Sequence, residues 1–455
     1  MAGIAQQLDY KKIEASNPSY RMTKLLPLQS TPAAPNTLIS TSGGTETIIE
    51  LPVVAMNLNK SILHFTLTPP ANGAGTYNWM YLDAMNCFQQ VQLYNRTGTL
   101  LCDLQQPQNY TKVVWKADIP YDQFRNFDTF SNNTGSGRFL RPTNAANGST
   151  TQGFVAVRPD GTSTSMNYIE NSYLEVAAAN TAGPVLDFSF PLAMIKNSIF
   201  DVDKDIFFNE IMILRLVWGP SSKVGYYSNS ATNPNSSPIA FNSGCDVQNI
   251  YLFLATERNQ EIIGELKEEV SMSGFSIPIP FIYSFKTVNS SSTNQSSTLR
   301  ITRGHGARLL KVYHSLFNPN ESSYTAYANT TINGSTTYLQ NFYTQIDNYR
   351  LQDFNVDLAL NTDWAILQRK LEGSITFNSN IYRFNWFWVD DFTSAGPTAD
   401  ESDPTADNRL EGIDLDAEKR YDFIAYMNSP TAFNHYDFVI TQKMLAISNA
   451  GMSCA

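Results

Sequence analysis

Short runs of β-branched and aromatic residues recur along the chain, each bounded by clusters of Gly, Pro, Asn and Ser. In residues 62–68 apolar and polar positions alternate, so that 63, 65 and 67 face one way and their neighbours the other. Alternation of this kind predicts half-buried strands. We predict strands at residues 47–53, 62–68, 89–94, 184–190, 211–218, 247–255, 275–283, 298–302, 308–315, 374–378, 381–389, 421–426 and 436–447.

Helical patterns are few and short. Residues 259–270 carry one apolar stripe with carboxylates around it, which is typical of an amphipathic helix. Residues 362–371 begin with a capping Thr or Asp and continue with an apolar face. Residues 77–88 are a third helical candidate.

Long polar stretches of low charge separate the predicted strands. They alternate with strands too regularly to be domain linkers, so we interpret them as surface loops at the ends of sandwiches. These stretches are residues 131–164, 221–243, 289–297, 318–337 and the more acidic 393–408.

The order of strands, turn signals and aromatic stretches recurs in the second half of the chain. Residues 47–53 and 61–68 lead to a Pro-Pro turn signal, and residues 298–302 and 308–316 lead to an Asn-Pro signal. Each half then closes on another β-rich run. The repetition predicts two copies of one β fold.

Two tandem eight-stranded antiparallel jelly-roll sandwiches, with long loops and a few short helices, satisfy this all-β pattern. The predicted organisation is an N-terminal arm at 1–35, a first jelly roll at 36–258, a connecting helix or linker at 259–270, a second jelly roll at 271–449 and a C-terminal tail at 450–455.

Composition narrows the class of protein. The 455 residues include 31 Lys and Arg against 41 Asp and Glu, which gives a net charge of −10. An acidic chain with scattered positive charges excludes wrapping of duplex nucleic acid. The 12% aromatic content and the low charged fraction, 16%, both argue against global disorder.

The predicted compartment is reducing. The N-terminus lacks the apolar core of a signal peptide, and no apolar run reaches the length of a membrane span. We therefore expect synthesis in a cytosolic or nuclear assembly compartment with reduced thiols, the alternative being a bridge between Cys87 and Cys102. The four cysteines are Cys87, Cys102, Cys245 and Cys454.

Motifs for catalysis and for metal binding are not recognisable. The sequence has no phosphate-binding Gly-x-x-x-x-Gly-Lys-Ser/Thr, no Gly-x-Ser-x-Gly, no His-Glu-x-x-His and no Cys-x-x-Cys. We expect no enzyme activity, no catalytic residue, no cofactor and no metal site.

Each of the four histidines has a structural and a functional interpretation. Residues 303–306, Arg-Gly-His-Gly, predict a tight turn in which Gly304 and Gly306 take positive φ, although an oxyanion or phosphate loop is the alternative. His64 and His314 occupy similar places in the two repeats, and we interpret them as half-buried strand histidines satisfied by neighbours rather than as metal ligands.

His435 and Asp437 lie two residues apart in a predicted strand. They should share one face of that strand, side by side rather than hydrogen-bonded to each other. No nucleophile that would complete a catalytic set with this pair is identifiable.

Three further segments have a functional and a structural interpretation. Residues 390–418 are acidic, and we interpret them as a solvated loop rather than a calcium site. Residues 384–388, Phe-Asn-Trp-Phe-Trp, predict a core-facing aromatic row rather than a ligand-stacking platform. The predicted arm has four basic residues against Glu14, and we expect a disordered terminus rather than contact with DNA, a membrane or another protein. The four are Lys11, Lys12, Arg21 and Lys24.

Three segments resemble one family of proteins. They are residues 187–195 (DFSFPLAMI) followed by 206–218 (IFFNEIMILRLVW), residues 343–352 (YTQIDNYRLQ) and residues 434–447 (NHYDFVITQKMLAI). Together they are similar to passages of the double jelly-roll major capsid proteins of small eukaryotic double-stranded DNA viruses, of the virophage and polinton-like type. The resemblance extends from about residue 36 to 450.

The resemblance implies a structural role in a virion. Proteins of this family form homotrimers with a pseudo-hexagonal outline, and these capsomers tile an icosahedral shell. The implied partners are other copies of the chain, penton proteins and minor capsid proteins, with no sequence-specific nucleic-acid binding. The residues of the trimer interface and any contact with an inner membrane stay open. The alternative function is a carbohydrate- or receptor-binding β-sandwich, such as a viral fibre or a lectin.

Overall fold

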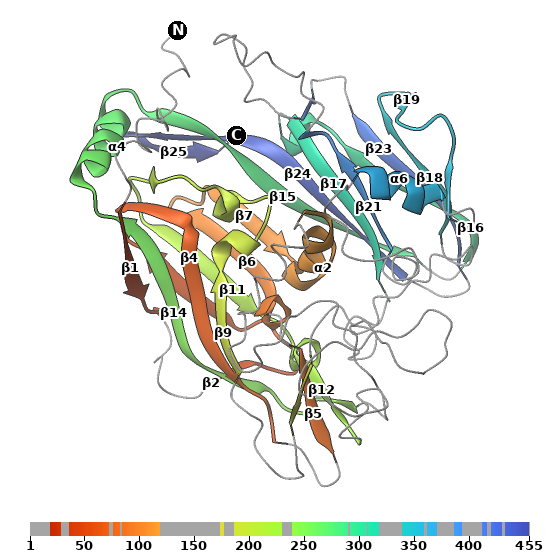
Figure 1. Ribbon diagram of the computed structural model, residues 1–455, viewed down its shortest axis with the longest axis horizontal. Coiled ribbons are helices and arrows are strands. Elements are labelled where there is room, and N and C mark those ends of the chain that lie inside the picture. The colour runs from red at the N-terminus through yellow and green to blue at the C-terminus, as the bar shows by residue number, and fades with distance from the viewer. Residues whose placement is uncertain are drawn as a thin grey trace.

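The computed structural model places most of the residues that it describes in antiparallel β-sheets (Figure 1). It describes residues 19–28, 36–71, 76–81, 84–118, 173–176, 186–229, 239–289, 292–306, 308–317, 339–358, 362–370, 386–393, 412–415, 420–429 and 433–454.

The first half of the chain forms two facing sheets, named here after their central strands. The β14 sheet has the order β1–β14–β4–β10, with β2 also beside β14 and β9 also beside β4. The β11 sheet has the order β3–β11–β6–β7. The strands are β1 (Tyr20–Leu25), β2 (Asn36–Ile39), β3 (Glu46–Leu51), β4 (Ala55–Thr68), β6 (Phe88–Asn95), β7 (Leu100–Gln105), β9 (Leu186–Pro191), β10 (Ile206–Phe207), β11 (Met212–Trp218) and β14 (Cys245–Glu257).

The second half repeats this arrangement. The β24 sheet has the order β15–β24–β17–β21, with β22 also beside β17 and β25 also beside β24, and the β23 sheet has the order β16–β23–β18–β19, with β20 beside β18. The strands are β15 (Phe275–Asn289), β16 (Ser292–Ile301), β17 (Arg308–Phe317), β18 (Leu339–Ile346), β19 (Tyr349–Arg350), β20 (Val356–Asp357), β21 (Phe387–Asp391), β22 (Ile413–Asp414), β23 (Tyr421–Ser429), β24 (Phe433–Ser448) and β25 (Gly451–Cys454).

The central strands of the two halves correspond. The sequence repeat aligns β4 with β17. In the first half β14 lies between β1 and β4, and in the second half β24 lies between β15 and β17. Likewise β3–β11–β6 corresponds to β16–β23–β18. The predicted all-β fold with an internal repeat is therefore confirmed.

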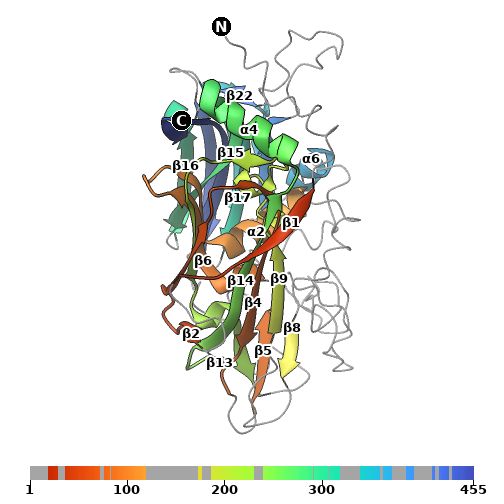
Figure 2. The same cartoon turned by 90° about the vertical axis from the view of Figure 1, so that its left-hand side faces the viewer.

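A small additional sheet extends the first sandwich away from helix α4 (Figure 2). Its order is β13–β12–β5–β8, and the strands are β5 (Tyr77–Tyr81), β8 (Tyr173–Val176), β12 (Gly225–Ser228) and β13 (Ile239–Ala240). Three predictions were wrong here and nearby. Residues 77–88 form β5 and the short 3-10 helix η2 (Ala84–Cys87) rather than one helix, the polar stretch 221–243 contains two strands, and most of 289–297 belongs to β16.

Two predicted helices are present. Helix α4 (Gln260–Met272) begins after Asn259, whose side chain accepts a hydrogen bond from the Glu261 N–H at 3.0 Å, and α6 (Thr362–Lys370) lies in the second half. Helix α2 (Pro107–Asp118) was not predicted. Its signals are nevertheless present: Pro at the first helical position, and buried apolar residues at 110, 113, 114 and 117.

The chain ends depart from the predicted arm and tail. Strand β1 pairs with β14 along its whole length, so residues 20–25 belong to the first sandwich rather than to a disordered terminus. Strand β25 pairs with β24, so residues 451–454 belong to the second sandwich rather than to a tail. The predicted strand at 374–378 and the loops at 131–164 and 318–337 lie outside the described residues.

Candidate functional site at the junction of the two sandwiches

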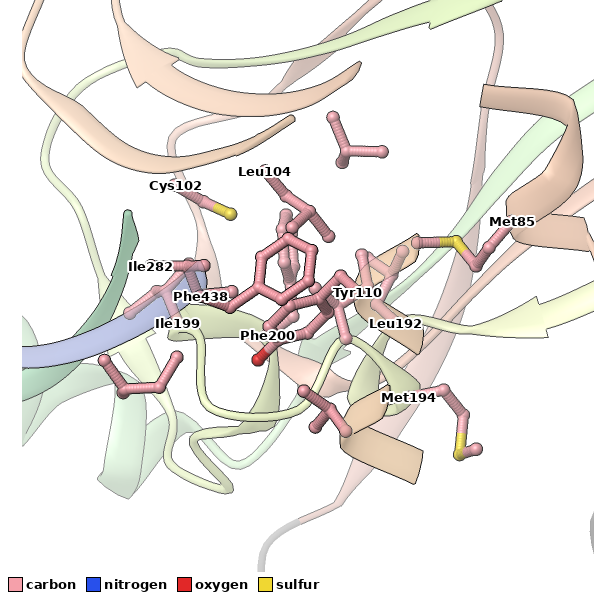
Figure 3. Close-up of a cluster of buried hydrophobic side chains, with 14 of the residues drawn as sticks. Met85, Cys102, Leu104, Tyr110, Leu192, Met194, Ile199, Phe200, Ile282 and Phe438 are labelled. Atoms are coloured by element: carbon pink, nitrogen blue, oxygen red, sulfur yellow. The ribbon is translucent and has the colours of Figure 1, made fainter. Parts of the chain in front are cut away.

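Helix α2 follows β7, packs against β6 and η2 of the first sandwich, and also contacts β17 of the second. Tyr110 of this helix is fully buried, and its ring meets Phe438 of β24 edge-on with centroids 5.2 Å apart. Its hydroxyl donates to the Lys196 carbonyl at 2.6 Å. Figure 3 shows the surrounding cluster, in which Cys102 and Leu104 come from β7 and Ile282 from β15. The two sandwiches thus share buried apolar side chains at this junction.

A charged pair lies at the end of α2. Asp118 accepts hydrogen bonds from Tyr313 Oη at 2.5 Å and from Asn197 Nδ2 at 2.7 Å, and Lys311 Nζ lies 3.2 Å away. Lys311 also pairs with Asp391 at 3.1 Å. A carboxylate at a helix C-terminus is unfavourable because of the helix dipole, and these donors offset it. Burial tends to lower the pKa of Lys311, but Asp118 and Asp391 outweigh burial and raise it.

A second contact joins the C-terminal strand to the first sandwich. The Met452 N–H donates to Glu210 Oε1 at 3.0 Å, and Asn95 donates to the other oxygen of Glu210 at 2.9 Å. Thr99 donates to the Met452 carbonyl at 3.3 Å. With α4, whose buried stripe packs on β10 and β24, these contacts close the other side of the junction.

His64 and His305 lie outside the junction contacts described above. His64 is half-buried on β4, stacked on Tyr251 with centroids 5.5 Å apart, with Nδ1 3.1 Å from Ser189 Oγ and 3.3 Å from Asp187. This agrees with a strand histidine satisfied by its neighbours. His305 lies in the short helix η7 (Arg303–His305). In the turn that follows, Gly306 has φ +145°, whereas Gly304 does not take a positive φ, contrary to expectation.

His314 differs from its prediction because it is completely buried. Its Nδ1 lies 2.5 Å from Asp437 Oδ1, and its Nε2 lies 2.9 Å from Tyr421 Oη. His435 Nε2 lies 2.9 Å from the same oxygen of Asp437 without forming a hydrogen bond, so the two side chains lie side by side on one face, as predicted. Tyr421 donates to Asp390 at 2.8 Å.

Burial sets the electrostatics of this cluster. It lowers the pKa of His314 despite the neighbouring Asp437. Burial alone would raise the pKa of Asp437, but His435 and His314 hold it far below its usual range. Burial and the charge of Asp390 raise the pKa of Tyr421 well above its usual range. At neutral pH the cluster therefore contains an ionised aspartate and a neutral tyrosine.

The predicted acidic loop and the predicted aromatic row are described only in part. Asp390 and Asp391 of the predicted acidic loop are instead bound in the structure, Asp390 to Trp388 at 3.1 Å and Asp391 to Lys311, while 394–411 and 416–419 lie outside the described residues. Trp386 and Trp388 are buried, as the predicted aromatic row requires; Phe384 lies outside the described residues.

Two of the four predicted basic residues of the arm lie on β1. They are Arg21 and Lys24, and Lys24 Nζ lies 3.3 Å from the ring centre of Tyr251; Lys11 and Lys12 lie outside the described residues. The four cysteines are free, and burial raises the pKa of Cys102 and of Cys245. None of the described helices is long and apolar enough to span a membrane.

No family model and no curated protein matches the sequence, but solved structures match the fold over nearly the whole chain. The cryo-EM structure of the Sputnik virophage aligns with a TM-score of 0.56 at 9% identity, covering 96% of this chain and 88% of that one. The crystal structure of the mavirus major capsid protein gives 0.52 at 8% identity, covering 95% and 90%. The quasi-atomic PBCV-1 virus capsid gives 0.51 at 11% identity, covering 96% and 97%.

The class that this architecture defines is the double jelly roll. The structural neighbours are viral capsid proteins, and the expected resemblance to double jelly-roll major capsid proteins is confirmed at the level of the fold.

Proposed function

We propose that the chain is a major capsid protein that forms homotrimers, and that these trimers tile an icosahedral virion shell as pseudo-hexameric capsomers. The observation that carries this proposal is the presence of two sandwiches of equal strand order in one chain. Three such chains around a three-fold axis place six similar sandwiches in a ring. The likeness to viral capsid proteins along nearly the whole chain supports the same role.

The junction suits this role physically. A capsomer holds its outline only if the two sandwiches of each chain keep one relative placement. The buried cluster around Tyr110 and the Asp118–Lys311 pair supply contacts of this kind on one side, and Glu210 supplies them on the other. A surface with few charges also allows copies to pack closely without strong like-charge repulsion.

The protein acts in the virion shell as a structural component rather than an enzyme. Its partners are other copies of itself, then penton and minor capsid proteins, and it reads no nucleic-acid sequence.

The test is the solution mass of the purified protein with negative-stain images of the same fraction. We expect a trimer of three 50.8-kDa chains, about 152 kDa, with a pseudo-hexagonal outline. A raised protein concentration should then yield closed shells or flat hexagonal arrays. A stable 50.8-kDa monomer at every concentration, with dose-dependent glycan binding, contradicts the proposal and favours a receptor-binding sandwich.

A further inference from the structure

Three buried side chains converge between the two sheets of the second sandwich. They are His314 on β17 and His435 and Asp437 on β24, and each offers one ligand atom within 4.8 Å of the other two. The strand register explains the meeting, because His314 lies directly opposite Asp437, and His435 lies two residues before Asp437 on the same face. None of the three exceeds 1% exposure.

The proton positions in this cluster are constrained. Asp390 accepts hydrogen bonds from Trp388 Nε1 and from Tyr421 Oη, so the hydroxyl proton of Tyr421 is used there. Tyr421 Oη must then accept from His314 Nε2, 2.9 Å away. A neutral His314 with its proton on Nε2 turns the lone pair of Nδ1 towards Asp437 Oδ1, only 2.5 Å away. Two facing lone pairs require a cation between them.

Either a proton or a metal ion satisfies this requirement, and the environment of His435 distinguishes between the two. Among the described residues neither ring nitrogen of His435 has a hydrogen-bond partner, although the side chain is only 1% exposed. Its Nε2 lies 2.9 Å from Asp437 Oδ1 without hydrogen-bond geometry. An unsatisfied buried polar group costs about 1–3 kcal/mol. A proton shared by His314 and Asp437 leaves that cost in place, whereas a metal ion also binds His435.

We propose that His314, His435 and Asp437 bind a divalent transition-metal ion of the zinc class. Two imidazoles and a carboxylate form a donor set that zinc accepts. The chain from His314 Nε2 through Tyr421 to Asp390 is the hydrogen-bond support that orients metal-bound histidines.

The three ligands are buried, so we assign the site a structural role, and a buried water molecule completes the tetrahedral coordination that three protein ligands leave open. It joins β17 to β24, the two central strands of their sheet, and the ion enters during folding. Ligand atoms of a tetrahedral zinc site lie roughly 3.3 Å apart, so small side-chain rotations that separate Asp437 from His314 accompany binding.

The test is refolding of the full chain from denaturant, in parallel with a chelator, with Zn²⁺ and with Co²⁺. After removal of free metal, we expect about one zinc per chain and a Tm several degrees above that of the chelator sample. The cobalt sample should show the visible absorption of a tetrahedral site. His435→Gln should reduce the bound zinc to below about 0.1 per chain, because it removes one ligand.

The matched control is His64→Gln. His64 also lies on a strand beside an aspartate, but in the first sandwich and outside the cluster, so this variant should keep the zinc content and the cobalt spectrum. If His435→Gln fails to fold, the wild-type comparison still decides. The proposal is overturned if the wild type refolds equally well with the chelator, binds no zinc and gives no tetrahedral cobalt spectrum. The cation between His314 and Asp437 is then a proton.

Discussion

The two sandwiches share one strand order but bury different chemistry. In the first, Phe65 packs against Phe188 with centroids 5.0 Å apart and edge-on against Trp218 at 5.3 Å, within an aromatic and aliphatic core. In the second, the corresponding space holds His314, stacked on Phe423 at 3.8 Å and joined to Asp437. Strand order therefore does not determine what a sandwich holds between its sheets.

The difference follows from which face of a strand is covered. On β4 the alternation is regular, with Leu63 and Phe65 buried and His64 towards the partly exposed outer face. On β17 both faces are covered, because Tyr313 and Lys311 meet α2 of the first sandwich while His314 points between the sheets. A strand covered on both faces has room for polar groups only when they are paired.

The largest effect is expected at the junction that covers β17. Asp118→Ala leaves Lys311 and Tyr313 without their acceptor, and removal of one member of a largely buried pair costs about 3 kcal/mol of unfolding free energy. Urea unfolding followed by fluorescence should then split into two transitions as the sandwiches uncouple.

Lys60→Ala is the control for this variant. Its ion pair with Asp203, at 2.7 Å, is 40% and 52% exposed, so the loss should stay below about 1 kcal/mol. An Asp118→Ala protein that loses no more stability than the Lys60→Ala protein would refute the importance of the junction pair.

A smaller effect on stability is expected when the buried tryptophan of one core is compared with that of the other. Trp218 Nε1 donates to the Thr47 hydroxyl at 2.8 Å, whereas Trp388 Nε1 donates to the Asp390 carboxylate at 3.1 Å. Both rings are fully buried. Beyond the shared loss of ring volume, Trp388→Phe should cost about 1 kcal/mol more than Trp218→Phe, because hydrogen bonds to charged groups are stronger. Equal losses in chemical denaturation would mean that Asp390 is not ionised in the core.

The pH dependence of stability should have opposite signs in the two sandwiches. Burial and the neighbouring Glu257 raise the pKa of Asp205 in the first sandwich from 3.8 to about 6. The folded state then binds a proton that the unfolded chain has lost, so this group lowers stability as pH rises from about 4 to 6, and its effect is constant above that. Asp205→Asn should remove this slope.

Asp422 of the second sandwich supplies the opposite slope. Burial alone would raise the pKa of Asp422, but hydrogen bonds from Arg300 and Gln345 outweigh burial and lower it. Its contribution is fully present above the unfolded-state pKa of about 4 and is lost as pH falls through the lowered value. Unfolding free energies across pH should show Asp422→Asn less sensitive to acid than wild type, and a variant as acid-sensitive as wild type contradicts this assignment.

The sequence pattern predicted the buried face of an element correctly where the opposite face of that element meets solvent. The alternation of β4 and the single apolar stripe of α4 gave the correct faces, because each packs on one side only. The same rule failed for β17, whose second face is covered by a helix from a different sandwich. The buried cluster was also missed, because His314 and Asp437 are 123 residues apart and only the strand register joins them.

The smallest effect on stability is expected at the turn between β16 and β17. The sequence predicted a positive φ at both Gly304 and Gly306, but only Gly306 has one. Gly306 has φ +145°, and a Cβ there would lie 2.7 Å from Thr441 Oγ1, so Gly306→Ala should cost about 1 kcal/mol or more. At Gly304 the nearest atom to such a Cβ is 3.9 Å away, so Gly304→Ala should change the unfolding free energy by less than about 0.5 kcal/mol. Equal costs at the two positions would mean that both glycines take positive φ in solution, and the turn would then have the two-glycine geometry that the sequence predicts.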